Sequence, residues 1–328
     1  MNKRDVTMKK ILGFDLGGTK VLAAVLDHDF NILSRVKMKA NADLGVESVY
    51  RVICNVIEDA CEEAGIKIKD LVAIGGCAPG LVEPHTGLVY DTPNLGFKNF
   101  PLQAKLEKDF KVPVHIENDV NAGLYGELHF GAARGMRNVL ALSPGTGVGG
   151  AIVIDGNLYR GALGGAAEFG HILVQPDGPL CGCGQRGCLE AIASRTALSQ
   201  QILSFAVRGR IPLVIEEAKG NLKKVKSGLI ARAYESEDPD VKEIVHYAAK
   251  YLGVGMSNLA NCFNPEAIIL GGGLIEALPE PFVKISSKVL RKTAMNVNAK
   301  EIKVVPASLG DDAVIKGTAK LASELIAN

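Results

Sequence analysis

Apolar and polar positions along the chain predict short buried strands separated by glycine-rich turns. Apolar runs at 11–14 and 21–26 flank the pair Gly17-Gly18, which indicates two strands joined by a tight turn. The same pattern returns about 125 residues later in NVLALSPGTGVGGAIVID. This repeat predicts two related α/β halves produced by an internal duplication.

The remaining pattern extends both halves. Helical spacing marks 49–64, with Val52, Val56 and Ala60 on one side, and also 239–263. Buried strands are predicted in LVAIGGCAPG, VPVHIEND and EAIILGGG, a turn-rich loop in TPNLGFKNFP, and a final helix from about Asp312. Ligands of such sheets bind at the carboxyl ends of the strands, so a cleft between the two halves is expected to gather them.

Length and charge narrow the class of protein. A chain of 328 residues suits two domains, expected at 1–134 with 312–328, and at 135–311. Lys plus Arg number 37 against 36 Asp plus Glu, so neither nucleic acid nor a membrane is expected as partner. No apolar run reaches the eighteen residues of a membrane span, and the seven unevenly spaced cysteines do not form a disulfide framework. We therefore expect a cytoplasmic protein with reduced thiols.

Three glycine turns are candidate nucleotide sites. The turn at 15–20 lies between two strands, so it is neither a Walker A loop nor a dinucleotide fingerprint, which both require a following helix. One interpretation is a plain hairpin without a ligand. The other is a polyphosphate-binding turn, in which free backbone amides, Thr19 and Lys20 contact the phosphates and Asp15 holds Mg²⁺ through water. The glycines of this first turn are Gly17 and Gly18. The second turn, formed by Gly145, Thr146 and Gly147, would bind the same phosphates. The third turn, formed by Gly271, Gly272 and Gly273, suits an adenosine or is a simple helix cap.

Asn118 and Asp119 are the polar residues at the end of the strand VPVHIEND. An aspartate at this position often caps the next helix. An amide beside a carboxylate at one strand end also suits adjacent sugar hydroxyls, and Asp119 is placed to point into the cleft. As a base, it would accept the proton of an attacking hydroxyl.

The segment GHILVQPDGPLCGCGQRGCLEA contains one histidine and three cysteines with metal-ligand spacing. His171, Cys181, Cys183 and Cys188 match a closed tetrahedral zinc site, which leaves no open position for catalysis. A redox pair would favour Cys-x-x-Cys instead. The metal is therefore expected to be scaffolding that holds the flanking Glu168 and Glu190 in a hydroxyl-binding pocket, while His171 donates from its second ring nitrogen. The other cysteines are expected to be small core residues: Cys54, Cys61, Cys77 and Cys262.

Together these motifs resemble the ROK family of sugar kinases in the actin-like ATPase superfamily. The resemblance runs from DLGGTK through EFGH, CGCGQRGCLE and LGGG to GDDAVIKGTA. It implies a two-domain actin-like ATPase (RNase H-like) fold with an interdomain active-site cleft. It also implies that Asp119 is the general base and that the turns at 17–20 and 145–147 contact the phosphates. The sugar contacts that it implies come from Asn94, Asn118, Glu168, His171 and Glu190. Ala167 departs from the glycine usual in relatives, which bears on specificity more than on activity.

The expected activity is ATP-dependent phosphorylation of the 6-hydroxyl of a hexose, with glucose favoured and Mg²⁺ neutralising the phosphates. N-acetylglucosamine or N-acetylmannosamine is the alternative substrate, and polyphosphate the alternative donor. The family also contains sugar-responsive repressors, but only fourteen residues precede Asp15, too few for a helix-turn-helix module. A non-catalytic sugar sensor would be expected to lack Asp119 or a glycine turn. By resemblance, the protein is expected to be a homodimer or homotetramer.

Overall fold

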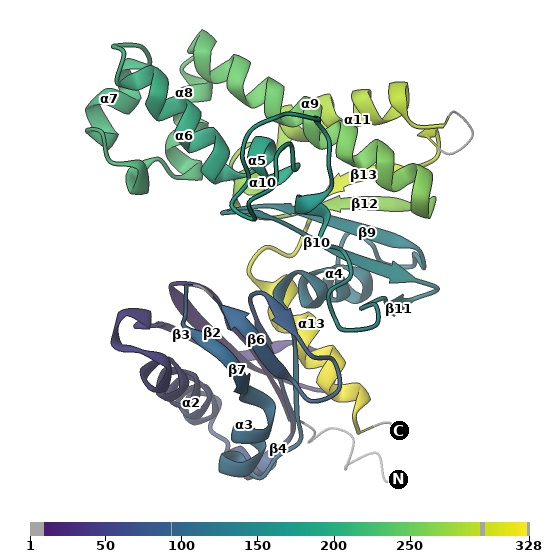
Figure 1. Ribbon diagram of the computed structural model, residues 1–328. Coiled ribbons are helices and arrows are strands. Elements are labelled where there is room, and N and C mark those ends of the chain that lie inside the picture. Colours follow the sequence, from purple (N-terminus) through teal and green to yellow (C-terminus); the bar gives the residue numbers. More distant parts are fainter. Residues whose placement is uncertain (1–9, 93, 296–298, 327–328) are drawn as a thin grey trace. The chain divides into compact units, whose positions relative to one another are not determined.

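The computed structural model describes residues 10–92, 94–295 and 299–326 (Figure 1). They form two compact units. Unit 1 contains the chain up to Gly135, Leu158–Ala166 and the chain from Ser308 onward; unit 2 contains Met136–Asn157 and Ala167–Ala307. The short segment Leu158–Ala166 thus lies in unit 1, an assignment that the sequence pattern does not suggest. In the described part of the chain, no helix is long and apolar enough to cross a membrane.

Unit 1 is built on a five-stranded sheet of order β3-β2-β1-β4-β8. β1 is antiparallel to β2, as the glycine-turn pattern predicts, and parallel to β4, which is parallel to β8. The strands are β1 (Lys10–Leu16), β2 (Lys20–Leu26), β3 (Ile32–Lys39), β4 (Leu71–Ala78) and β8 (Val114–Asn118). The helices are α2 (Val46–Glu63), α3 (Leu102–Phe110), α4 (Asp119–Phe130) and α13 (Asp312–Glu324), with 3₁₀ turns at Ala42–Leu44 and Ile68–Asp70.

Alternation along β1 directs its side chains to two different helices. Leu12 and Phe14 belong to the core cluster that includes the buried face of α2, whereas Ile11 packs in a cluster with Ile315 of α13. A Cβ on Gly13 would lie 2.4 Å from the Ile315 carbonyl oxygen, so glycine here lets α13 pack closely on the sheet. The final helix predicted from Asp312 is therefore confirmed, and it packs on the strand that carries Asp15.

A small sheet of unit 1 corrects one prediction. β5 (Leu81–Val82), β6 (Leu88–Thr92) and β7 (Phe97–Pro101) form three antiparallel strands. The predicted loop TPNLGFKNFP was therefore wrong over its second half, which is β7. Phe97 and Phe100 of this strand are buried and stack with ring centroids 4.5 Å apart, so tertiary packing outweighs the turn-forming residues around them.

Unit 2 contains a second five-stranded sheet, of order β11-β10-β9-β12-β13. Like unit 1, it begins with an antiparallel glycine hairpin and continues with parallel strands, which confirms the predicted relation between the two halves. The strands are β9 (Val139–Pro144), β10 (Val148–Ile154), β11 (Asn157–Leu158), β12 (Ala267–Leu270) and β13 (Lys303–Pro306).

Helices account for most of the rest of unit 2. The long helical pattern is confirmed as α9 (Pro239–Phe263), which packs against α11 (Pro279–Thr293) (Figure 1). The others are α5 (Glu190–Ala193), α6 (Arg195–Ala206), α7 (Pro212–Ala218), α8 (Ser227–Glu235) and α10 (Gly273–Ala277), with 3₁₀ turns at Phe169–His171 and Leu222–Lys224.

One cysteine departs from the expected core position, and a second is buried as expected but has a polar partner. Cys262 of α9 is exposed, because it lies in the last turn of the helix on a side that nothing in the described chain covers, so the core prediction was wrong there. Cys77 is buried, but its thiol contacts a carboxylate rather than only apolar groups.

Candidate functional site

Two aspartates of unit 1 lie where parallel strands of its sheet end. Asp15 is near the carboxyl end of β1, and Asp119 follows the carboxyl end of β8 as the first residue of α4. Cys77 of β4 is paired in register with both Asp15 and Glu117, so these strand ends meet. The Cys77 Sγ donates to Asp15 Oδ1 at 3.2 Å. The predicted gathering of polar groups at the strand ends is therefore present in unit 1.

Burial and like charge make Asp119 a stronger base than an ordinary aspartate. The side chain is half-buried. Burial raises the pKa of Asp119 to about 6, and the negative charge of Asp15 adds to the rise. Burial also raises the pKa of Asp15. Such a pair of carboxylates is typical of sites that bind a cation or transfer a proton.

Asn118 is the N-cap of α4. Its Oδ1 accepts the backbone N–H groups of Val120 at 2.9 Å and Asn121 at 3.0 Å, and its Nδ2 donates to the Gly80 carbonyl at 3.0 Å. The capping role is thus taken by Asn118 rather than by Asp119. One Nδ2 hydrogen is left over for a ligand.

Glu117 is a buried charge behind these residues that sequence reasoning missed. Its Oε2 accepts from Arg160 Nε at 2.7 Å, and its Oε1 accepts from Asn121 Nδ2 at 3.0 Å. Burial alone would raise its pKa, but His115, whose Nε2 lies 3.7 Å from Oε2, and the charge of Arg160 lower the pKa of Glu117 to about 2. The available signal was a carboxylate at an inward position of a buried strand.

The glycine turn of unit 1 keeps its predicted hairpin form. The Gly17 N–H donates to the Lys20 carbonyl at 2.9 Å, and Gly18, Thr19 and Lys20 are exposed. A Cβ on Gly18 would meet nothing within 4 Å, so local packing does not require glycine there. Asn94 is exposed in the turn between β6 and β7; in the described chain, no hydrogen bond joins it to Asn118 or Asp119.

The two glycine turns of unit 2 are neighbours. They follow β9 and β12, which are adjacent and parallel, and the Gly271 N–H donates to the Leu142 carbonyl at 2.9 Å. Gly272 has φ of 83°, and a Cβ there would lie 2.8 Å from the Pro144 carbonyl oxygen. Glycine is therefore required at this position by both conformation and space.

Other glycines of unit 2 let the segment EFGH approach β10. A Cβ on Gly150 would lie 2.3 Å from the Ala167 carbonyl oxygen, and a Cβ on Gly170 would lie 2.2 Å from the Val148 carbonyl oxygen. Ala167 itself has φ of 69°, in the left-handed region that favours glycine. Alanine in place of the glycine that relatives have at position 167 therefore strains the backbone beside Glu168, which is exposed.

The four predicted metal ligands converge. The ligand atoms of His171, Cys181, Cys183 and Cys188 all lie within 4.8 Å of one another. Cys183 Sγ lies 3.7 Å from Cys188 Sγ, and Cys181 Sγ lies 3.7 Å from His171 Nδ1. A tetrahedral zinc with Zn–S bonds of about 2.3 Å separates its sulfur ligands by roughly 3.8 Å. The donor set and its spacing therefore fit a closed zinc site, and the sulfurs are too far apart for a disulfide bond.

Glu190 joins this cluster to the turn at 145–147. Its Oε2 accepts the Val148 N–H at 3.0 Å, and its Oε1 lies 3.6 Å from Cys181 Sγ. A Cβ on Gly147 would lie 2.2 Å from the same Oε2, so glycine leaves room for the carboxylate. The first residue of α5 is thereby held in place on both sides.

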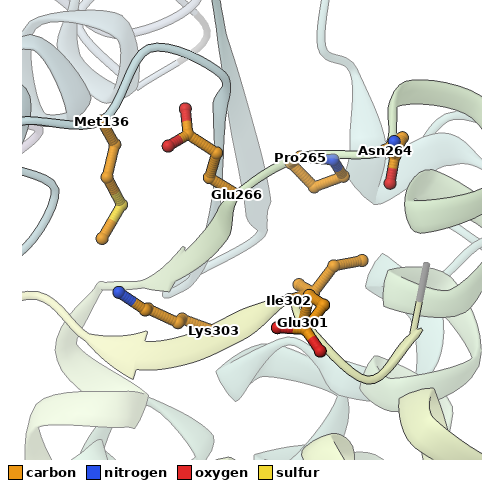
Figure 2. Close-up of a pocket in the computed structure, with 7 residues that line it drawn as sticks. All are labelled: Met136, Asn264, Pro265, Glu266, Glu301, Ile302 and Lys303. Atoms are coloured by element: carbon orange, nitrogen blue, oxygen red, sulfur yellow. The ribbon is translucent and has the colours of Figure 1, made fainter. Parts of the chain in front are cut away.

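Unit 2 contains a pocket of about 460 Å³ (Figure 2). It is lined at the amino ends of β12 and β13, opposite the strand ends that carry the glycine turns. Glu266, which Figure 2 shows at its wall, accepts the Arg137 and Asn138 N–H groups at 2.7 and 2.9 Å. This carboxylate is engaged in holding the backbone, and none of the predicted site residues lines the pocket.

Each of the two five-stranded sheets begins with a glycine hairpin and continues with parallel strands. Two such sheets define the actin-like ATPase class of fold. A glucokinase of Streptomyces coelicolor is 35% identical over 316 residues, which cover 95% of this chain and 97% of that protein. A solved ROK family glucokinase of Streptomyces griseus, in complex with glucose and AMPPNP, is 34% identical with a TM-score of 0.82, covering 96% of this chain and 99% of that one. A xylose repressor of Bacillus spizizenii is 34% identical over 254 residues, 77% of this chain and 62% of the repressor.

The chain belongs to the ROK family, whose model matches residues 11–325. This confirms the family resemblance of the sequence motifs and the fold class that it implies.

Proposed function

We propose that this ROK protein is an ATP-dependent hexose kinase that phosphorylates the 6-hydroxyl of its sugar, with glucose preferred. The observation that carries the proposal is the half-buried Asp119 beside Asp15 at the strand ends of unit 1. The alignment with glucokinases over nearly the full length of both chains supports it.

Asp119 is the general base. With a pKa of about 6, it is roughly nine-tenths ionised at neutral pH and still binds a proton more strongly than an ordinary aspartate. Asp15 would hold Mg²⁺ through water: its Oδ1 accepts from the Cys77 thiol, so Oδ2 is the oxygen that would remain for this role. The magnesium ion neutralises the phosphates of ATP when bound.

Side chains from several segments hold the sugar hydroxyls. They are Asn94, Asn118, Glu168, His171 and Glu190. In His171, Nδ1 faces the cysteine sulfurs, so Nε2 is the nitrogen available to a hydroxyl. His171, Cys181, Cys183 and Cys188 would hold a structural zinc, which would stiffen the segment that carries these groups and take no part in the transfer.

The glycine turns bind the nucleotide. Gly17, Gly18, Thr19 and Lys20 contact the phosphates with Gly145, Thr146 and Gly147, while the turn at 271–273 accepts the adenosine. Backbone amides are suitable here because phosphoryl transfer depends mainly on positioning and on stabilising charge.

An assay of hexose phosphate formation tests the activity with either donor, and ADP release is measured in addition when ATP is supplied. Glucose, mannose, fructose, N-acetylglucosamine and N-acetylmannosamine are each supplied with ATP or with polyphosphate. We expect turnover with ATP and the highest kcat/KM for glucose. Preference for an N-acetylated sugar would reassign the substrate, and no turnover with any sugar would contradict the kinase proposal.

Asp119→Asn tests the base. The variant is expected to bind glucose nearly as the unmodified protein does, but to lower kcat by about a hundredfold or more. Its matched control is Asp43→Asn, an exposed aspartate of the same unit, which should retain full turnover. Near-normal kcat in Asp119→Asn would exclude Asp119 as the base.

A sugar-sensing regulator is the second candidate, because xylose repressors match three quarters of this chain. A regulator would bind glucose without releasing ADP. Calorimetric glucose binding in a preparation that lacks turnover would favour this function over a kinase.

A further inference from the structure

Arg195 and Thr196, at the start of α6, hold the glycine turn at 145–147 from one side. The Arg195 N–H donates to the Gly145 carbonyl at 2.8 Å, and Thr196 Oγ1 donates to the Thr146 carbonyl at 2.6 Å. In a trans peptide, the N–H points opposite to the C=O of the same unit. The N–H groups of Thr146 and Gly147 therefore point away from α6, on one common side of the turn.

These two N–H groups make no hydrogen bond within the described chain. Successive free amides of this kind form a concavity that binds anions. The turn is open at this point, since Thr146 is exposed and a Cβ on Gly145 would meet nothing within 4 Å.

The Arg195 side chain adds a positive charge beside the amides. Its Nη2 donates to Thr146 Oγ1 at 2.8 Å. Among the described residues, no carboxylate forms a salt bridge with Arg195. A guanidinium has five N–H donors, so most remain available, and its planar fork matches phosphate oxygens.

We propose that Arg195 is a phosphate-binding residue of the nucleotide site. It binds the terminal phosphates of ATP together with Thr146 Oγ1 and the N–H groups of Thr146 and Gly147. The inference rests on the proposed function in that ATP is the phosphoryl donor. Arg195 neutralises charge that magnesium leaves on the transferring group, and the hydroxyl of Thr146 keeps its guanidinium beside the turn.

Binding titrations separate phosphate contact from simple support of the turn. AMPPNP, adenosine and inorganic tripolyphosphate are titrated into the full chain and into Arg195→Ala, Arg195→Lys and Thr196→Val. Thr196→Val is the matched control, because it removes a hydrogen bond to the same turn without removing charge. Arg208→Ala, two residues beyond the end of α6, controls for net charge; Arg208 Nη1 donates to the Ser204 carbonyl of that helix.

Arg195→Ala is expected to weaken AMPPNP and tripolyphosphate binding about tenfold or more, and adenosine binding less than about twofold. Arg195→Lys should recover part of the loss, and in turnover the KM for ATP should rise while the KM for sugar stays constant. Equal losses in Arg195→Ala and Thr196→Val, or an equal loss of adenosine, would show that Arg195 only supports the turn and would overturn the proposal.

The unmodified protein distinguishes this result from failure of the kinase proposal. If it binds AMPPNP but phosphorylates no hexose, the proposed function fails and the Arg195 comparison still decides the inference. If it binds neither AMPPNP nor tripolyphosphate, both are wrong.

Discussion

Asp119→Asn should stabilise the protein at neutral pH while it removes activity. Burial and the charge of Asp15 raise the pKa of Asp119 from 3.8 to about 6. The ionised carboxylate is therefore less stable in the folded chain than in the unfolded one. The rise of the pKa from 3.8 to about 6 corresponds to about 3 kcal/mol of folding free energy.

The sign of the pH dependence follows from this raised pKa. Protonated Asp119 contributes to the free energy of unfolding. This contribution is fully present below the unfolded pKa of 3.8 and is lost as the pH rises through about 6. Asparagine cannot ionise, so the variant escapes the loss. Its advantage in free energy of unfolding should be roughly 1 kcal/mol at pH 4.5 and approach about 3 kcal/mol at pH 8.

Thermal unfolding from pH 4.5 to 8, without added nucleotide or metal, measures this advantage. A gain of about 3 kcal/mol corresponds to a Tm increase of roughly 6–12 °C at pH 8 for a unit of this size. Asp43→Asn, with its exposed side chain, should show no pH-dependent difference. An advantage that is absent at pH 8, or that grows toward acid pH, would refute the argument from burial and like charge.

Three further changes test other parts of the structure. Cys188→Ser should remove about one zinc per chain, lower the Tm and raise the KM for sugar more than the KM for ATP. Cys262→Ser is the control and should retain the metal. Freshly purified protein without zinc in elemental analysis would contradict the site. Ala167→Gly should raise the free energy of unfolding by about 1 kcal/mol in denaturant titration, because it relieves a left-handed alanine, and a loss of stability would exclude that strain. Glu117→Gln should lower the free energy of unfolding by about 3 kcal/mol, because Arg160 loses its charged partner; unchanged stability would show that the pair contributes little.

Local patterns were sufficient to predict much of this protein. The 3.6-residue period of 239–263 marks a helix whose bounds the structure reproduces, and the glycine turns between apolar runs mark both hairpins. The spacing of His171 and the three cysteines likewise predicts a cluster that the fold brings together. These features depend on residues close in sequence, so a short window contains the information that determines them.

Only the tertiary structure showed what lies beside each group. The second half of the loop expected at 92–101 forms β7, because Phe97 and Phe100 pack into a core contributed by distant segments. Glu117 meets Arg160, and Arg195 meets Thr146, across separations of 43 and 49 residues. The raised pKa of Asp119 likewise depends on burial and on the charge of Asp15, which strand pairing brings to the same end of the sheet. Periodicity and spacing describe neighbours along the chain, whereas charge, burial and close packing depend on neighbours in space.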